Sequence, residues 1–381
     1  MHEIVVLGAG YAGLSATMGL AGRLRSRSDV RITVVNAGER FTERLRLHQV
    51  AAGQQVADLR IPDLLAPTGV ELVPGWVTGL DADACAVRID DERELPYDTL
   101  VYALGAVADT GSVAGAAEHA YAVDDADLFA RRLAGARSVV VCGGGLTGVE
   151  AAAEIAESHP AVDVTLVGRT GPGTNLGPRA KAHLDRALAR LGVSVRSGAD
   201  VTAIGPEGVT VDGHELIRAD AVLWTSGVRV SPLAAEAGLD VDDRGRIVTD
   251  PALRSVSHPQ VYAIGDAAAI RQPYGTVHGT CQSGMPTGAY AAWAIARALG
   301  GKPGKPFRFG YLHVPISLGR RDAVVQFTHP DDSPKRLALT GRAARWYKET
   351  VSSAPWPTFG RTVAAPSVTM LGWRRGGRYT R

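Results

Sequence analysis

The chain has 381 residues, of which 45% are hydrophobic and 21% charged, and its formal net charge is +2. These values are typical of a globular enzyme with two or three domains, and the lack of any run of 18 apolar residues argues against a transmembrane span. A first strand near residue 4 leaves no room for a secretory signal. Three isolated cysteines, Cys85, Cys142 and Cys281, argue against a disulfide framework or a structural zinc site. We therefore expect a cytoplasmic protein without a metal.

The sequence opens on a strand, a glycine-rich turn and a helix in direct succession. An apolar IVVL run predicts a buried parallel strand, and Gly8, Gly10 and Gly13 follow in GxGxxG spacing. A helix over residues 11–24 and a strand over 31–35 complete a βαβ unit of the length that dinucleotide binding requires. Such glycines admit a tight turn and a close-lying pyrophosphate, to which the helix N-terminus offers free N–H groups. A glycine-rich turn without a ligand is the alternative.

The residues after the second strand depart from the usual pattern. Asn36 stands where a dinucleotide fold normally places an acid on the adenosine ribose, although an amide can also accept a hydroxyl hydrogen bond. Segment 39–53 then crowds charged and polar side chains, which lie either beside a bound cofactor or on a solvated helix surface: Arg44, Arg46, His48 and Gln49.

A second βαβ unit with a glycine-rich turn begins near residue 138. An apolar strand leads into Gly143, Gly145 and Gly148, and a helix to about residue 158 and a strand over 162–167 follow. Two such units predict two dinucleotides, one resident and one exchanged.

In the second unit, Gly168 stands where a dinucleotide fold normally places an acid, and Arg169 follows it. A carboxylate would repel a 2′-phosphate, whereas a small residue followed by arginine accommodates one, so NADPH is slightly favoured over NADH. The alternative is that Arg169 only stacks on adenine or points into solvent.

Several later strands also end in small residues. An apolar run over 99–106 contains Gly105, and another over 221–227 ends at Gly227, where glycine permits close approach to a ligand. Asp266 follows a strand and a glycine, which suits a carboxylate that accepts hydrogen bonds from a polyol or one that caps a helix. From Thr280 we expect a Gly/Pro-interrupted lead into a helix ending near residue 299, and an antiparallel sheet over 307–340.

The charge is unevenly distributed along the chain. Residues 335–381 contain ten Lys or Arg and one acid, a net +9, so the remainder carries −7. This basic tail also carries Trp346, Tyr347, Trp356, Phe359 and Trp373. Cations interleaved with aromatic residues suit an anionic membrane surface, but a face that covers the acidic body or a homodimer contact would explain the charge equally well.

Five motifs together resemble the two-dinucleotide flavoprotein oxidoreductases: GAGYAG, YALGA, GGGLTGVE, WTSGV and AIGDAAA, in that order. The chain is most similar to type II NADH dehydrogenases and apoptosis-inducing-factor-like flavoproteins. The resemblance implies an α/β fold with two Rossmann-like domains, one for FAD and one for NAD(P)H, and a small C-terminal α+β domain. It implies FAD-domain parts at 1–108 and 236–304, an NAD(P)H domain at 109–235 and a C-terminal domain at 305–381.

The resemblance also assigns roles by position. It places the first three glycines on the FAD pyrophosphate, Asn36 at the ribose and Asp266 at the ribityl chain. The second three glycines would hold NAD(P)H, with Glu150 near the nicotinamide unless it only stabilises its helix dipole. We place Arg46, His48 and Gln282 on the acceptor side of the flavin, where His48 could supply a proton.

Two departures from the family pattern concern the acceptor. The CxxxxC pair of disulfide reductases is missing, so disulfide chemistry is not expected. In the AQxAxQ segment of type II dehydrogenases, the first glutamine is retained as Gln282 and the second is Pro286.

These features predict an FAD-dependent enzyme that passes a hydride from NAD(P)H to FAD and on to a quinone or another acceptor. The alternatives are a soluble tailoring oxidoreductase acting on a small metabolite and a flavin redox sensor without turnover. We expect no nucleic acid partner and a cytoplasmic location, with peripheral contact to the inner face of the membrane as an option.

Overall fold

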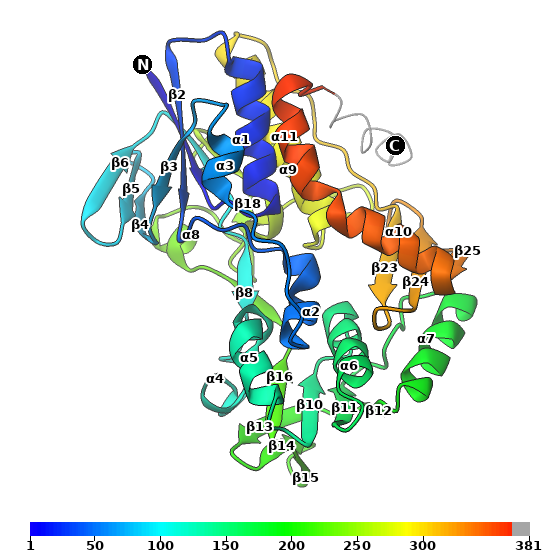
Figure 1. Ribbon diagram of the computed structural model, residues 1–381. Coiled ribbons are helices and arrows are strands. Elements are labelled where there is room, and N and C mark those ends of the chain that lie inside the picture. The colour runs from blue at the N-terminus through cyan, green and yellow to red at the C-terminus, as the bar shows by residue number, and fades with distance from the viewer. Residues whose placement is uncertain (368–381) are drawn as a thin grey trace.

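The computed structural model describes residues 1–367; Trp373 of the aromatic tail lies outside them. Two five-stranded parallel sheets dominate the architecture, one at the top and one at the bottom of Figure 1. The first sheet has the order β19 (Val261–Ala263), β7 (Thr99–Tyr102), β1 (His2–Leu7), β2 (Val30–Asn36) and β3 (Glu71–Pro74). The second has the order β12 (Ser194–Ser197), β11 (Asp163–Gly168), β10 (Ser138–Cys142), β16 (Ala221–Trp224) and β9 (Tyr121–Ala122).

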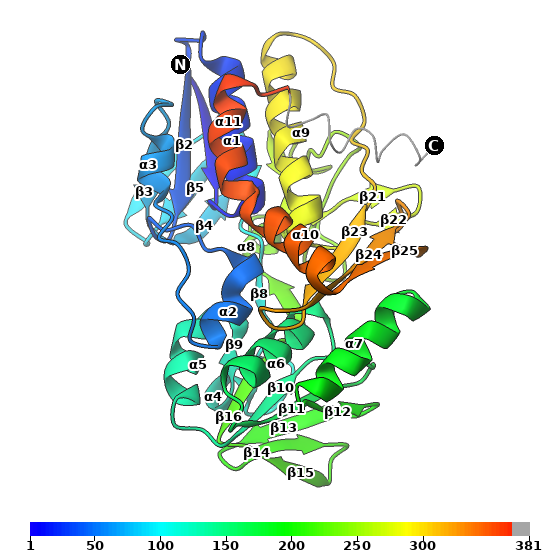
Figure 2. The same cartoon turned by 45° about the vertical axis from the view of Figure 1, so that its right-hand side comes forward.

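Helices cover the sheets, and three of them pack side by side on the first sheet (Figure 2). They are α1 (Tyr11–Leu24), α9 (Cys281–Leu299) and α11 (Pro355–Ala364). Glycines allow the close approach, because a Cβ on Gly288 would lie 2.1 Å from the Ala12 carbonyl oxygen and one on Gly22 would lie 2.6 Å from that of Val363. The second sheet carries α5 (Ala126–Leu133), α6 (Leu146–Ser158) and α7 (Pro178–Arg190).

Helix α9 begins earlier than the sequence suggested. It starts at Cys281 rather than after an interrupted lead, because Thr280 and Ser283 form a capping box at its N-terminus. Pro286 therefore lies inside the helix, where it is buried.

The chain near its C-terminus forms a three-stranded antiparallel sheet and two helices. The sheet comprises β23 (His313–Ser317), β24 (Ala323–Thr328) and β25 (Pro334–Thr340), and α10 (Gly341–Ser353) packs on it. Helix α11, which follows α10, packs on the first large sheet's helices and buries Phe359 in the same core. Helices α10 and α11 thus connect the small sheet with the first large one.

The remaining elements are short and lie around the two sheets. They are η1 (Arg44–Arg46), α2 (Leu47–Ala51), α3 (Ile61–Leu65), β4 (Val77–Asp81), β5 (Ala86–Ile89), β6 (Arg93–Pro96), β8 (Ala106–Ala108), α4 (Ala116–His119), η2 (Val123–Asp125), β13 (Val201–Gly205), β14 (Gly208–Val211), β15 (Glu215–Arg218), β17 (Val228–Val230), α8 (Leu233–Glu236), β18 (Ile247–Val248), η3 (Gly265–Ala267), β20 (Ala268–Ala269), β21 (Arg271–Gln272) and β22 (Gly275–Thr276).

The α/β fold class with two parallel sheets is confirmed, whereas the domain boundaries at 108, 235 and 304 stay a prediction. None of the helices in the described part of the chain combines the length and the apolar character needed to span a bilayer.

Candidate active site

The first glycine turn lies where three parallel strands end at the same level. Leu7 pairs with Val35 on one side and with Tyr102 on the other, so the residues that follow them meet at one sheet edge. Gly8 has a φ of +94°, and a Cβ there would lie 2.6 Å from the Ala103 carbonyl oxygen. A Cβ on Gly13 would lie 1.8 Å from the Gly8 carbonyl oxygen. Both positions therefore require glycine for backbone packing.

Gly10 has a different role, because a Cβ there would meet no protein atom within 4 Å. It lines a cavity of about 1040 Å³ and is the N-cap of α1, whose N-terminus no side chain caps. The free N–H groups of the first turn therefore remain available to an anionic ligand. The glycine, the cavity and the helix end together fit a bound dinucleotide pyrophosphate.

Asn36 lines this cavity, but its side chain already has partners. Its Oδ1 accepts a hydrogen bond from the Ala9 N–H at 2.9 Å, and its Nδ2 donates to the Gly38 carbonyl at 2.7 Å. The amide thus fastens the glycine turn to the end of β2.

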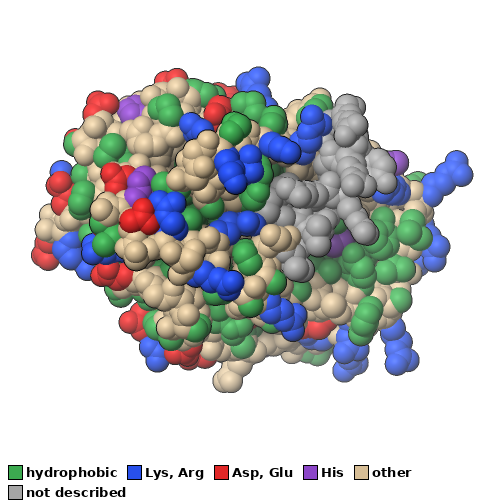
Figure 3. Space-filling view, turned by 90° about the horizontal axis from the view of Figure 1, so that it is seen from above, with side chains coloured by type: hydrophobic (Ala, Val, Ile, Leu, Met, Phe, Trp, Pro, Cys, Tyr) green, Lys and Arg blue, Asp and Glu red, His purple; other side chains and the backbone are tan. Residues whose placement is uncertain are grey.

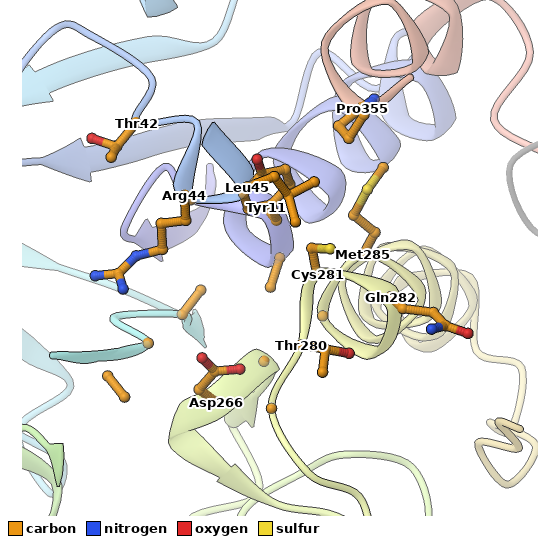
Figure 4. Close-up of a pocket in the computed structure, with 18 of the residues that line it drawn as sticks. Tyr11, Thr42, Arg44, Leu45, Asp266, Thr280, Cys281, Gln282, Met285 and Pro355 are labelled. Carbon is orange, nitrogen blue, oxygen red and sulfur yellow. The ribbon is translucent and has the colours of Figure 1, made fainter. Parts of the chain in front are cut away.

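Other predicted residues contribute further parts of the same cavity wall (Figure 4). Asp266 stands in η3, and burial raises the pKa of its carboxyl group while the positive charge of Arg44 opposes the shift. Arg44 also forms a 3.0 Å ion pair with Asp124 across the junction between the two units. Gly105, in a left-handed conformation between β7 and β8, lines the cavity as well.

Arg46 does not line the cavity, although the sequence placed it near the flavin. Its guanidinium forms an ion pair with Glu349 on α10 and lies 3.6 Å from Glu43. These contacts join η1 to α10.

The second glycine turn repeats the geometry of the first. Gly143 has a φ of +127°, and a Cβ on Gly148 would lie 1.9 Å from the Gly143 carbonyl oxygen. A Cβ on Gly145, the N-cap of α6, would meet no protein atom within 4 Å. Gly227, with a φ of +75°, follows β16 at the same edge.

The three glycines of the second turn do not line the cavity, but the first turn of α6 does, through Leu146 and Thr147. Gly168, at the end of β11, has no room for a side chain, because a Cβ there would lie 2.7 Å from the Gly144 nitrogen. Arg169 is 77% exposed and lies 3.5 Å from the Asp200 carboxylate.

His48, Glu150 and Lys348 form a buried cluster of charged and titratable side chains in the cavity wall. The Glu150 carboxylate accepts hydrogen bonds from Lys348 Nζ at 2.9 Å and from the Ser317 N–H at 2.8 Å. Burial alone would raise the pKa of Glu150, but these partners hold it below its usual range. His48 lies 3.9 Å from Glu150, and its burial lowers the pKa of the imidazole to about 4. The ring is therefore neutral at pH 7.

Gln282 connects α9 to β23. Its Nε2 donates to the His313 carbonyl at 2.8 Å, and its Oε1 accepts from the Leu312 N–H at 2.7 Å. It lines the cavity beside Cys281, whose thiol pKa burial raises to about 11. Pro286 does not line the cavity.

Sequence reasoning missed Lys348 and His313. Both line the cavity, and His313 Nδ1 lies 2.6 Å from the Tyr347 hydroxyl. Burial and the charge of Lys348 lower the pKa of His313 to about 4. No local pattern marks Lys348, because its partner Glu150 lies in a distant part of the chain.

The tail aromatics mostly have structural partners. Trp356 and Phe359 both pack against Phe41 in the first unit. Trp346 is 73% exposed.

The comparisons with known proteins agree with this geometry. The model of the pyridine nucleotide-disulphide oxidoreductase family matches residues 2–296. An NADH dehydrogenase-like protein of Mycobacterium tuberculosis is 31% identical, covering 93% of this chain and 94% of that protein. A type II NADH:quinone oxidoreductase of Staphylococcus epidermidis is 30% identical, covering 88% and 92% respectively. The sulfide:quinone oxidoreductase structure from Aquifex aeolicus superposes with a TM-score of 0.78 at 18% identity, covering 96% and 92%, which shows a shared fold.

Proposed function

Because the chain belongs to the pyridine nucleotide-disulphide oxidoreductase family, we propose that it is an FAD enzyme that passes electrons from NAD(P)H to a quinone. One observation carries the proposal. A single cavity is lined both by the first glycine turn and by the first turn of α6, which follows the second glycine turn. A resident flavin and a visiting nicotinamide can therefore meet inside it.

The residues around the cavity would hold FAD. Gly8, Gly10 and the α1 N-terminus would hold the pyrophosphate, and Asp266 would accept hydrogen bonds from the ribityl hydroxyls. The N-terminus of α9 also opens on the cavity, through Thr280 and Cys281, and its positive dipole would stabilise negative charge on the ring. When bound, FAD supplies the hydride acceptor that the protein's side chains lack.

The cluster around Glu150 would set the electrostatics on the nicotinamide side. Its carboxylate is ionised and held by Lys348, so a charged pair stands at the cavity wall. Gln282 would position the α9 N-terminus through its two hydrogen bonds to the backbone of Leu312 and His313, at the start of β23. His48, neutral and buried behind Glu150, would act on protons rather than bind the substrate.

The acceptor would bind at one wall of the cavity, part of which is drawn in Figure 4. This wall is largely apolar, which suits a quinone ring, and its residues are Tyr11, Leu45, Cys281, Met285 and Pro355. The S. epidermidis relative is named for a quinone acceptor. The loss of the second glutamine to Pro286 does not alter this wall, since Pro286 does not line the cavity.

A preference for NADPH remains part of the proposal. Arg169 is exposed beside the second glycine turn, where its guanidinium could pair with a 2′-phosphate. Asp200 competes for the same guanidinium, so we expect a small preference.

We also propose peripheral membrane contact through the C-terminal unit. Leu337 and Trp346 are exposed there at 59% and 73%, and Lys335, Arg336, Arg342 and Arg345 are exposed around them in sequence. Figure 3 shows most acidic side chains on the left of its view, with Lys and Arg side chains both among them and toward the right. If this contact exists, the protein should sediment with anionic vesicles and not with neutral ones. A protein that binds no vesicles and is dimeric in solution would instead favour a homodimer contact.

Anaerobic reduction tests the central proposal. The purified protein, loaded with FAD, should lose its yellow colour on addition of NADH or NADPH and regain it when a water-soluble quinone follows. A reduced protein that only a small metabolite reoxidises would favour a tailoring oxidoreductase, and one that no acceptor reoxidises would favour a redox sensor.

A further inference from the structure

Trp76 lies in the turn between β3 and β4, at the same sheet edge as the first glycine turn. Strand β3 pairs with β2 so that Pro74 is opposite Asn36, and the Gly75 N–H donates to the Asn36 carbonyl at 2.9 Å. Trp76 therefore stands beside the end of β2. In a dinucleotide fold the residue at the end of the second strand binds the adenosine ribose, while the pyrophosphate lies at the N-terminus of the first helix. Trp76 is thus placed at the adenosine end of a bound nucleotide.

The indole of Trp76 is unusually exposed for its type. Its exposed fraction is 71%, and it lines the large cavity. Tryptophan side chains are highly buried on average, because the ring has a large apolar surface. Trp346 has a similar exposed fraction, 73%, but does not line the cavity. The wall of the ligand cavity therefore offers a large aromatic surface that protein atoms leave mostly uncovered.

The backbone that carries this indole is held in place. The Trp76 N–H donates to the Asp90 Oδ1 at 2.8 Å, and the Trp76 carbonyl accepts from the Asp90 N–H at 2.9 Å. The Asp90 carboxylate is in turn bound by Arg93 at 2.8 Å. A ligand that stacks on Trp76 therefore has to order one side chain and no loop, which lowers the entropy cost of binding.

The same end of the cavity lacks the carboxylate that usually binds the ribose. Asn36 is neutral, and its amide already bonds to the Ala9 N–H and to the Gly38 carbonyl. A hydrogen bond to an ionised group is roughly twice as strong as one between neutral groups. The ribose is therefore held less strongly here, and a contact to the base contributes a larger share of the affinity for the adenosine half.

We infer that Trp76 stacks on the adenine base of FAD and so holds the adenosine end of the resident cofactor. The inference rests on the proposed function, in which the first glycine turn binds FAD. Stacking between a base and an aromatic ring requires only a flat apolar face, which the exposed indole supplies, and it removes that face from water. FMN has no adenosine half and cannot make this contact.

The test measures the binding of two flavins to the full chain after its own flavin has been removed. FAD and FMN share the isoalloxazine ring and the ribityl chain, and only FAD carries adenosine. We expect Trp76→Ala to raise the Kd for FAD about tenfold and to change the Kd for FMN less than about twofold. Trp76→Phe, which restores an aromatic face, should recover most of the affinity for FAD. Flavin fluorescence follows both titrations.

Trp346→Ala is the matched control, because Trp346 is as exposed as Trp76 and does not line the cavity. This variant should bind both flavins with the Kd of the parent. If FMN binds the parent too weakly to measure, thermal unfolding of the flavin-free chain replaces it. An unfolding midpoint of Trp76→Ala equal to that of the parent would then support stacking, and a lowered one would assign Trp76 a structural role and overturn the inference.

The remaining outcomes separate the inference from the proposed function. A Kd for FAD that keeps its parent value in Trp76→Ala would overturn the inference and leave the proposed function standing. An equal loss of affinity for FAD and FMN would show that Trp76 does not act on the adenosine half, and would overturn the inference as well. A parent chain that binds neither flavin would overturn the proposed function, and the inference with it.

Discussion

The two glycine turns have the same backbone geometry and different surroundings. In each, the first glycine adopts a positive φ, the second leaves open space at the N-cap of a helix, and the third packs against the carbonyl of the first. The first turn opens into the large cavity, which residues from α9, α10 and α11 help to enclose. The second lies outside that cavity. In the proposed function, each glycine turn would bind a nucleotide, and the enclosure of the first turn would make its nucleotide the resident one.

The matched third glycines give the largest expected contrast. Gly13→Ala places a Cβ 1.8 Å from the Gly8 carbonyl oxygen, and Gly148→Ala places one 1.9 Å from that of Gly143. Each forces its own turn to shift. We expect Gly13→Ala to purify with little flavin, and Gly148→Ala to remain yellow with a KM for NADH raised about tenfold or more. Absorbance and steady-state kinetics measure the two effects, and equal loss of flavin in both variants would contradict the division of roles.

Lys348 tests how far helix α10 stabilises the second unit through its contact with Glu150. Lys348→Met leaves Glu150 buried without its cation, which costs about 3 kcal/mol of unfolding free energy. Denaturant unfolding of the flavin-loaded protein measures the loss. Lys348→Met combined with Glu150→Gln should recover most of it, and a double variant no more stable than the single one would show that the pair is not the cause.

Glu154 should make the stability of the folded protein depend on pH. Its folded pKa of about 7 is raised above the usual 4.5, so its contribution is full below pH 4.5 and is lost as the pH rises through 7. Glu154→Gln should therefore be more stable than the parent at pH 8, by about 3 kcal/mol, and no more stable at pH 4.5. Thermal unfolding at both pH values makes the comparison, and a gain that is independent of pH would contradict it.

Arg169 gives the smallest effect, because it is exposed and shares its charge with Asp200. We expect Arg169→Ala to lower kcat/KM for NADPH about threefold relative to NADH. Arg179→Ala, an exposed arginine on α7, is the control. An unchanged ratio would remove the basis for an NADPH preference.

Local patterns were the reliable part of the sequence-based prediction. Both strand–glycine–helix units form within about twenty residues, and their hydrogen bonds and glycine requirements are set by neighbours in the chain. Predictions about side chains between these units were less complete. Arg46 seemed placed for the flavin, but Glu349 holds it elsewhere, and Asn36 supports a turn rather than standing free.

The sequence by itself determined two dinucleotide-binding units, their order and the α/β fold, because these depend on short-range periodicity and on glycine at fixed spacing. Only the tertiary structure decided that α6, α9 and α10 share one cavity and that His48 lies between two glutamates. Such contacts join residues hundreds of positions apart. They are set by how the sheets and helices pack, and packing leaves no periodic signal in the chain.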